Sequence, residues 1–129
     1  MTCFDAIFPQ LNLLICIGLP IANVYESKIE ILKIQKEKIR KHSAVSQQIA
    51  GLMASNVKNL FKSDIGFSTT GNAGPGLNDE KSRVGDLYIS LHFKNKTKTK
   101  FFKLEGNRDA NINKAVKVSL EFISENLDK

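Results

Sequence analysis

Three of the chain's eight glycines lie within six residues, in the segment Thr-Gly-Asn-Ala-Gly-Pro-Gly at positions 70–76. The segment directly follows a short strand-like run at residues 64–70. A glycine-rich turn at the carboxyl end of a strand exposes backbone N–H groups and lets a ligand approach the main chain closely. No Gly-Lys-Ser/Thr follows, and no helix begins there, so the segment is neither a Walker A loop nor a dinucleotide fingerprint. It predicts either a cradle for an anion or nucleotide, or a surface turn.

The chain of 129 residues has a formal net charge of +6, which favours anionic ligands, both phosphate-bearing small molecules and nucleic acid. Much of this charge lies in residues 28–41 and in the alternating Lys/Asn/Thr run at residues 94–100. Alternate strand positions share a face, so the lysines of the second run are expected to line one side of a hairpin tip. No aromatic residues interleave with them, which favours a solvated turn that blocks edge-to-edge pairing over a nucleic-acid surface.

The two cysteines, Cys3 and Cys16, have neither metal-ligand nor redox spacing, so we expect a reducing, cytoplasmic setting and assign no metal site. The apolar stretch at residues 11–24 is interrupted by Asn12, Pro20 and Asn23, which makes it too short to span a bilayer. It also lacks the basic region of a signal peptide. A buried strand is the preferred interpretation, with no membrane partner.

Hydrophobic periodicity predicts the order strand, helix, helix, strand, loop, hairpin, helix. The first strand is expected at residues 13–18, the first helix at 26–40, and the hairpin strands at 84–93 and 100–104. Ser46 is the expected N-cap of the second helix, and Asn107 or Asp109 that of the last. In the first helix, the residues expected to face inward are Ile29, Leu32 and Ile39. In the second they are Ile49, Leu52, Met53, Val57, Leu60 and Phe61, and in the last they are Ile112, Ala115, Val116, Leu120, Ile123 and Leu127. This order favours a layered α/β domain with a mixed sheet.

Several segments together resemble the C-terminal domain of the CinA family, whose members include nicotinamide-nucleotide amidases. One is His-Ser-Ala-Val-Ser at residues 42–46, which leads into its helix. Another is the loop at residues 70–76, followed by Asp-Glu-Lys at 79–81 and Val-Gly-Asp-Leu-Tyr-Ile at 84–89. Gly-Asn-Arg at residues 106–108 also matches the family's Gly-x-Arg pattern. We therefore assign residues 21–129 to a CinA C-terminal-like domain and residues 1–20 to a divergent N-terminal segment.

The resemblance implies a three-layer α/β/α fold with a mixed sheet, here truncated at its N-terminus. It implies hydrolysis of the amide of nicotinamide mononucleotide to nicotinate mononucleotide and ammonia, without a cofactor. Family members use a serine nucleophile, assisted by a lysine and a tyrosine from a Tyr-Ser-Asn-x-x-Lys-like segment. The partner implied is a small nucleotide, and apolar surface exposed by the truncation would favour a homo-oligomer.

Lys28 matches the family lysine in a catalytic role. On a helix it would share a side with Ile31 and Leu32, where desolvation favours the neutral amine that a general base needs. The alternative is a solvated lysine whose stem covers those carbons. Thr70 matches the family's hydroxyl residue, and it is expected to hold substrate or an oxyanion.

The resemblance also implies substrate-binding residues, namely Gly71, Asn72, Ala73, Gly74 and Arg108. The glycines would let backbone amides meet the phosphate or carboxamide of the ligand. Arg108 could pair bidentately with a phosphate, or it could be a solvated charge beside a helix start.

Two departures from the family pattern bear on activity. The family's tyrosine falls at Asn23, while Tyr25 takes the place of the family's asparagine. The family's Glu-Ser-Cys-Thr-Gly-Gly segment, which supplies the serine, has no counterpart in residues 1–19. Loss of such a nucleophile costs on the order of a millionfold in turnover. We therefore expect an amidase-like chain that is inactive or nearly so; the alternative is a non-catalytic nucleotide-binding or regulatory module.

Two other serines lie near the expected site. Ser46 is interpreted as a helix cap and Ser68 as a strand residue that faces the next layer, and neither has a nucleophile's motif around it.

Overall fold

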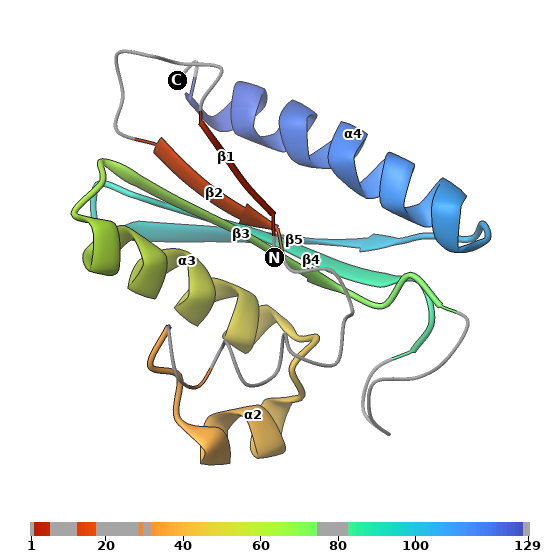
Figure 1. The fold of residues 1–129 in the computed structure, drawn as a ribbon, viewed down its shortest axis with the longest axis horizontal. Coiled ribbons are helices and arrows are strands. Elements are labelled where there is room, and N and C mark those ends of the chain that lie inside the picture. The colour runs from red at the N-terminus through yellow and green to blue at the C-terminus, as the bar shows by residue number, and fades with distance from the viewer. Residues whose placement is uncertain (1, 6–12, 18–28, 30–31, 75–82, 128–129) are drawn as a thin grey trace.

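The computed structural model describes residues 2–5, 13–17, 29, 32–74 and 83–127, which form one sheet with helices on both faces (Figure 1). The strands lie in the order β1-β2-β3-β4-β5; β2 and β3 are parallel, and the other neighbours are antiparallel. The strands are β1 (Thr2–Asp5), β2 (Leu13–Ile17), β3 (Ile65–Gly71), β4 (Asp86–Phe93) and β5 (Lys96–Lys103), and the helices are α2 (Lys36–His42), α3 (Gln47–Phe61) and α4 (Arg108–Leu127). The prediction of a small α/β domain is confirmed. So is the strand expected at residues 13–18, whereas β1 was not predicted.

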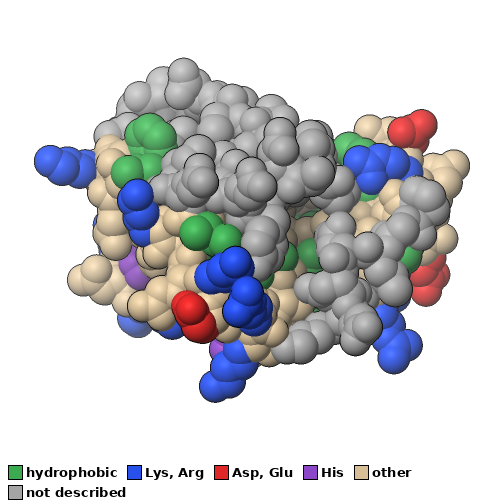
Figure 2. Space-filling model, turned by 60° about the horizontal axis from the view of Figure 1, so that its bottom comes forward, with side chains coloured by type: hydrophobic (Ala, Val, Ile, Leu, Met, Phe, Trp, Pro, Cys, Tyr) green, Lys and Arg blue, Asp and Glu red, His purple; other side chains and the backbone are tan. Residues whose placement is uncertain are grey.

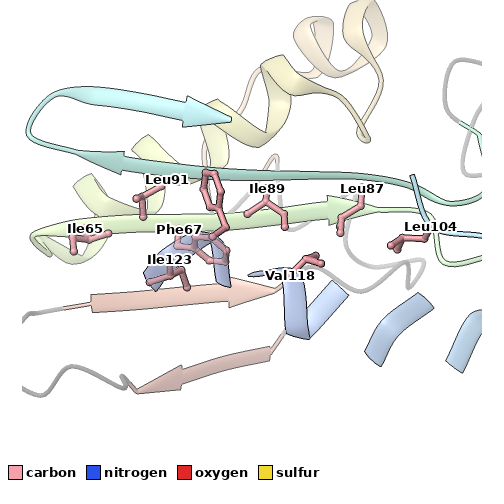
Figure 3. Close-up of a cluster of buried hydrophobic side chains, with 9 residues drawn as sticks. Ile65, Phe67, Leu87, Ile89, Leu91, Leu104, Val118 and Ile123 are labelled. Atoms are coloured by element: carbon pink, nitrogen blue, oxygen red, sulfur yellow. The ribbon is translucent and has the colours of Figure 1, made fainter. Parts of the chain in front are cut away.

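The face of the sheet under α4 carries the larger apolar core (Figure 3). Alternate residues of β3 and β4 point into it, as the alternation of residues 84–93 predicts. From α4, Val118, Phe122 and Ile123 pack against them, whereas Val116 is 39% exposed. The inward face predicted for α4 was therefore partly wrong, because Val118 and Phe122 define a helical face that the prediction had placed outside. The buried residues of this core are Ile65, Phe67, Leu87, Ile89, Leu91, Leu104, Val118, Phe122 and Ile123.

The opposite face, under α3, is lined by small and hydroxyl-bearing side chains. Ser68 Oγ donates to the carbonyl of Ala50 on α3 at 2.6 Å, as expected for a strand residue that faces the next layer. Gly66 lies under Ala54, so close that an added Cβ would overlap the helix backbone. Small residues on both surfaces thus let α3 approach the sheet more closely than large side chains would allow.

The outer face of α3 packs against the segment that precedes it. Ile49, Met53 and Val57 form a second cluster with Leu32, Ile34 and Ile39, as predicted for most of these residues. Leu60 and Phe61, which were predicted to face inward, are 48% and 55% exposed. Val57 is the last residue of α3 in this cluster among the described residues, so the prediction was wrong for the final turn of the helix.

The helix predicted at residues 26–40 is shorter where the structure describes it. Residues 33–35 are not helical, Lys33 has φ of 58°, and α2 begins only at Lys36. Leu32 and Ile34 both enter the second cluster, and Asn56 Nδ2 donates to the Leu32 carbonyl at 2.7 Å. The burial of Leu32 and Ile34, two residues apart, therefore decides the conformation of this segment, although its sequence favours a helix.

The lysine-rich run at residues 94–100 is mostly strand rather than turn. Only Lys94 and Asn95 form the turn, with φ of 52° and 60°, and β5 begins at Lys96. Two successive residues with positive φ are typical of a type I′ hairpin turn, which closes with two residues. The prediction of a longer turn was wrong, because β4 and β5 pair in register as far as Phe93 and Lys96.

Basic side chains of the first charged segment are on the surface. Lys36 and Lys38 on α2 are exposed, together with Glu37. Figure 2 shows Lys and Arg side chains gathered on the face that α2 helps to form. The charges of Lys36, Glu37 and Lys38 are therefore exposed to solvent.

The N-terminus of α3 is capped as predicted. Ser46 Oγ accepts from the Ile49 amide at 3.3 Å and donates to the Ser43 carbonyl at 2.8 Å. Ser46→Ala is expected to lower the free energy of unfolding by about 1–2 kcal/mol, because both bonds are lost at a buried cap. Urea denaturation tests this, with Ser55→Ala inside the same helix as a control that should change it by less than about 0.5 kcal/mol. Equal losses in the two variants would contradict the capping role.

Candidate functional site

The predicted cradle lies where β3 ends. Because β2 and β3 are parallel, with Ile17 opposite Thr69, both strands end at the same edge of the sheet. The turn before α3 and the start of α4 also lie at this edge. Each forms a hydrogen bond with the glycine segment at residues 70–76. The carboxyl ends of parallel strands are where α/β sheets usually bind ligands.

The first residues of the loop are held by hydrogen bonds of the main chain and of one side chain. The Asn72 amide donates to the Asp86 carbonyl at 2.9 Å, and the Gly85 amide donates to the Asn72 carbonyl at 2.7 Å. Asn72 Oδ1 accepts from the Gly74 amide at 3.0 Å. Two of the loop's N–H groups are therefore already engaged within the protein. The amide-lined cradle for a phosphate stays a prediction, and a ligand would have to share or replace the bond at Gly74.

Asn72 carries an unpaired donor at the centre of this loop. Its side chain is 2% exposed, and its Nδ2 has no hydrogen-bond partner among the described residues. Because Gly74 fixes Oδ1, the remaining side of the amide can only donate. A buried donor without a partner costs free energy, and a ligand oxygen or a water could satisfy it.

Thr70 is 2% exposed and is bound to the turn that precedes α3. Its Oγ1 donates to the Ala44 carbonyl at 2.7 Å. A hydroxyl has one proton, so in this arrangement Thr70 can accept from a ligand but cannot donate to an oxyanion. The adjoining Ser43 has φ of 81° and ψ of 147°, a conformation that residues with a Cβ rarely adopt. The motif at residues 42–46 and the end of β3 therefore form one connected unit.

Arg108 is half-buried at the first turn of α4 and contacts the loop directly. Its Nη1 donates to the Gly74 carbonyl at 2.9 Å. A guanidinium has five N–H donors, so one bond to the loop leaves donors for an anion. The structure thus places Arg108 against the glycine loop; its pairing with a phosphate stays a prediction.

Asn111, which sequence reasoning missed, joins the loop to α4. It is 2% exposed; its Nδ2 donates to the carbonyls of Ala73 and Gly106 at 3.1 and 2.9 Å, and its Oδ1 accepts from the Gly106 amide at 2.9 Å. Asn107 caps α4 through the Ala110 amide at 2.9 Å, as predicted. An asparagine at helical spacing from Ala115, Val118 and Phe122 was the signal that could have revealed it.

The charges next to the loop lie at the start of β4. Lys103 Nζ contacts Asp86 Oδ1 at 2.9 Å and also donates to the Val84 carbonyl. Tyr88, which pairs with Thr70 across the strands, has its pKa raised by burial and, second, by the Asp86 carboxylate, with Lys103 opposing. Tyr88 therefore stays protonated at neutral pH and keeps a phenol proton on this side of the sheet.

Some predicted site residues are outside what the structure describes. Lys28 lies there, as do Pro75 and Gly76 at the end of the glycine segment. Within the described ranges, no three His, Cys, Asp or Glu side chains gather in a way that could hold a metal ion. None of the helices in that part of the chain combines the length and the apolar character needed to cross a membrane.

Comparison with known proteins gives one consistent result. The family described as CinA C-terminal domain matches residues 20–127. A Clostridium botulinum protein (strain Okra / Type B1) named as competence-damage inducible is 39% identical over 103 residues, which are 80% of this chain and 25% of that protein. A CinA-like protein of Flavobacterium psychrophilum is 37% identical over 98 residues, 76% of this chain and 23% of the relative. The chain thus spans about a quarter of the length of these relatives.

Solved structures agree in fold. The structure of competence damage-inducible protein A from Klebsiella pneumoniae has a TM-score of 0.75 and 30% identity, covering 80% of this chain and 64% of that chain. A CinA superfamily protein from Enterobacter cloacae has a TM-score of 0.74 and 25% identity, covering 79% and 60%.

Proposed function

Because the chain belongs to the CinA C-terminal domain family, we propose that its glycine loop binds a pyridine nucleotide such as nicotinamide mononucleotide. The observation that carries this proposal is the contact of Arg108 with the Gly74 carbonyl, which puts a cation beside the loop at the carboxyl end of β3. Arg108 would pair with the phosphate. The unpaired donor of Asn72 would bind a second acceptor oxygen of the ligand.

The reaction proposed for this site is hydrolysis of the ligand's carboxamide. Water replaces the amide nitrogen, which leaves as ammonia, and the product is nicotinate mononucleotide. Lys28 would act as the base. Thr70 would orient the carboxamide by accepting a hydrogen bond from its NH₂ group, since the hydroxyl proton is held by Ala44.

We further propose that these 129 residues turn over slowly or not at all by themselves. No Glu-Ser-Cys-Thr-Gly-Gly segment occurs in the sequence. The hydroxyl protons of Ser46, Ser68 and Thr70 are all donated to backbone carbonyls, at 2.8, 2.6 and 2.7 Å. These bonds favour the second candidate function, a nucleotide-binding or regulatory module without chemistry.

Calorimetric titration with nicotinamide mononucleotide tests the binding proposal. Arg108→Ala is expected to weaken binding about 10- to 100-fold, because it removes charge-assisted hydrogen bonds. Thr70→Val should also weaken binding, and Thr70→Ser should retain most of it. Lys114→Ala, which removes an exposed charge from the same helix, is the control and should bind as the unchanged protein does. Absence of binding, or an equal loss in the control, would refute the nucleotide site.

Ammonia release from nicotinamide mononucleotide tests the activity. We expect a rate no better than background for this chain, because the attacking serine is absent. Turnover that is easily measured and that Lys28→Ala leaves unchanged would contradict both the inactivity and the role of Lys28. Binding without turnover would favour the non-catalytic module.

A further inference from the structure

β5 is an edge strand whose outer side has no strand beside it in the described part of the chain. It spans eight residues, and most of its side chains are exposed. We propose that this edge binds an extended acidic peptide, which adds to the sheet as a strand next to β5. The proposal rests on the backbone register of β5 and on the charge of one of its faces.

The register decides which backbone groups of β5 are free. Phe93 and Lys96 flank a two-residue turn, so they form a hydrogen-bonded pair, and the pairs then alternate along the hairpin. The backbone groups of Lys96, Lys98 and Lys100 therefore point toward β4. Those of Thr97, Thr99 and Phe101 point to the open edge, where a peptide could pair with them.

The same register places the lysines where carboxylates would meet them. Lys96, Lys98 and Lys100 lie on the face of the sheet that carries α4, opposite Phe93, Leu91 and Ile89. In an added strand, the residues facing Lys98 and Lys100 would form pairs without backbone hydrogen bonds, in which side chains are closest. Acidic residues at these positions would pair with both lysines.

Among the described residues, Lys96, Lys98 and Lys100 have no acidic partner. Lys103 does pair with Asp86, but Lys103 lies on the other face of β5. Lys98 Nζ instead donates to Asn126 Oδ1 at 3.2 Å, at an exposed position on α4. The edge of β5 therefore carries a row of lysine side chains beside backbone N–H and C=O groups that pair with no described strand. A strand with alternating carboxylates would be complementary to this edge.

The structure favours a peptide over two other occupants. A second copy of the chain would bring its own lysine row to this edge, and like charges across strands repel. Single-stranded nucleic acid is usually bound by cations together with open aromatic rings for stacking, but the ammonium groups of Lys94 and Lys100 lie 5.2 and 5.0 Å from the ring centroids of Phe93 and Phe102. Phe101 is exposed, but it lies on the α3 face and packs against Tyr88.

A shallow hollow at the same end of the sheet offers the peptide one additional contact, which strand addition and charge pairing do not require. It measures about 250 Å³, and Leu91 and Phe93 form its apolar surface between Lys94, Lys96, Lys98 and Asn126. The hollow is too small for a typical drug-sized ligand. A single apolar side chain of the peptide, next to its acidic residues, would fit it.

Fluorescence anisotropy with a labelled, amidated peptide of four Thr-Glu repeats tests the proposal at about 0.1 M salt. The double variant Lys98→Gln with Lys100→Gln is expected to bind about tenfold more weakly, because it removes two cross-strand charge pairs. The matched control, Lys114→Gln with Lys117→Gln on exposed positions of α4, should bind as the unchanged protein does. No binding at millimolar peptide, or an equal loss in the control, would overturn the proposal.

Two further probes separate strand addition from attraction by charge alone. A peptide with proline at its two central threonines keeps the charge but lacks N–H groups that face Thr97 and Thr99, and it should bind at least tenfold more weakly. Hydrogen exchange at the amides of Thr97, Thr99 and Phe101 should slow when the Thr-Glu peptide binds. Equal binding of the proline peptide overturns the proposal. The proposal is also overturned if a ten-nucleotide oligothymidylate binds more tightly than the peptide and the Lys98 and Lys100 changes abolish that binding. This result would identify a nucleic-acid surface.

Discussion

Gly66→Ala is expected to destabilise the domain by about 1–3 kcal/mol, a large share of the roughly 5–15 kcal/mol that is typical of a folded domain. The alanine Cβ would overlap the Ala54 carbonyl oxygen and would lie 2.8 Å from Lys58 Cβ. Both neighbours belong to α3, and the Ala54 contact is with backbone, so a rotamer change cannot relieve it. The helix would have to move away from the sheet, and the hydrogen bond between Ser68 and the Ala50 carbonyl would be strained or lost.

Gly51→Ala is the matched control, because it adds the same methyl group in the interior of α3. The nearest atom to its Cβ is Thr97 Cγ2 at 3.5 Å, an ordinary contact. Removing a glycine from a helix interior is expected to stabilise the protein by about 0.5–1 kcal/mol. Urea unfolding monitored by circular dichroism measures both variants. If Gly66→Ala were no less stable than the unchanged protein, the close packing of α3 on β3 would be wrong.

Asn111→Leu is expected to cost about 2–3 kcal/mol of stability and to weaken nucleotide binding at the glycine loop. Leucine has the same branched outline as asparagine but a larger volume, so the change removes three hydrogen bonds at 2.9–3.1 Å and also crowds a buried position. The Ala73 carbonyl would be left without that partner at a buried position, which carries a desolvation cost. Of the loop's contacts with α4 among the described residues, the bond from Asn111 would be lost and the bond from Arg108 would remain.

Unfolding and binding must be measured on the same variant to separate these effects. Asn113→Leu, at an exposed position of the same helix, should change stability by less than about 0.5 kcal/mol and leave binding unchanged. Asn111→Leu should reduce the affinity for nicotinamide mononucleotide even at temperatures where the variant is fully folded. A folded Asn111→Leu variant with unchanged affinity would show that the attachment serves stability alone.

The contacts that hold the glycine loop do not involve a nucleophile. Hydrogen bonds hold the loop to β4 through Asn72 and to α4 through Asn111 and Arg108. The end of β3 is bound to the turn before α3 through Thr70. These contacts come from elements needed for the fold itself. The absence of the serine would therefore leave the loop in place, as the proposed non-catalytic module requires.

The sequence by itself determined much of the architecture and the identity of the loop. Alternation in residues 84–93 predicted β4 and its buried face, Ser46 and Asn107 predicted the helix starts, and the glycine segment predicted a turn at the end of β3. These signals are local: a cap, a turn or a period depends on residues close in the chain, so their chemistry can be recognised without the fold.

Tertiary structure alone decided which of two helical faces of α4 is buried and how the loop is held. The stripe with Ile112, Val116 and Leu120 has more apolar residues, yet Asn111, Val118 and Phe122 face inward. Asn111 can be buried only because the Ala73 carbonyl, 38 residues away in sequence, meets its amide. Helical spacing can suggest that Asn111 faces inward, but only folding brings the partner that satisfies its buried amide, so this attachment could not be predicted from the chain.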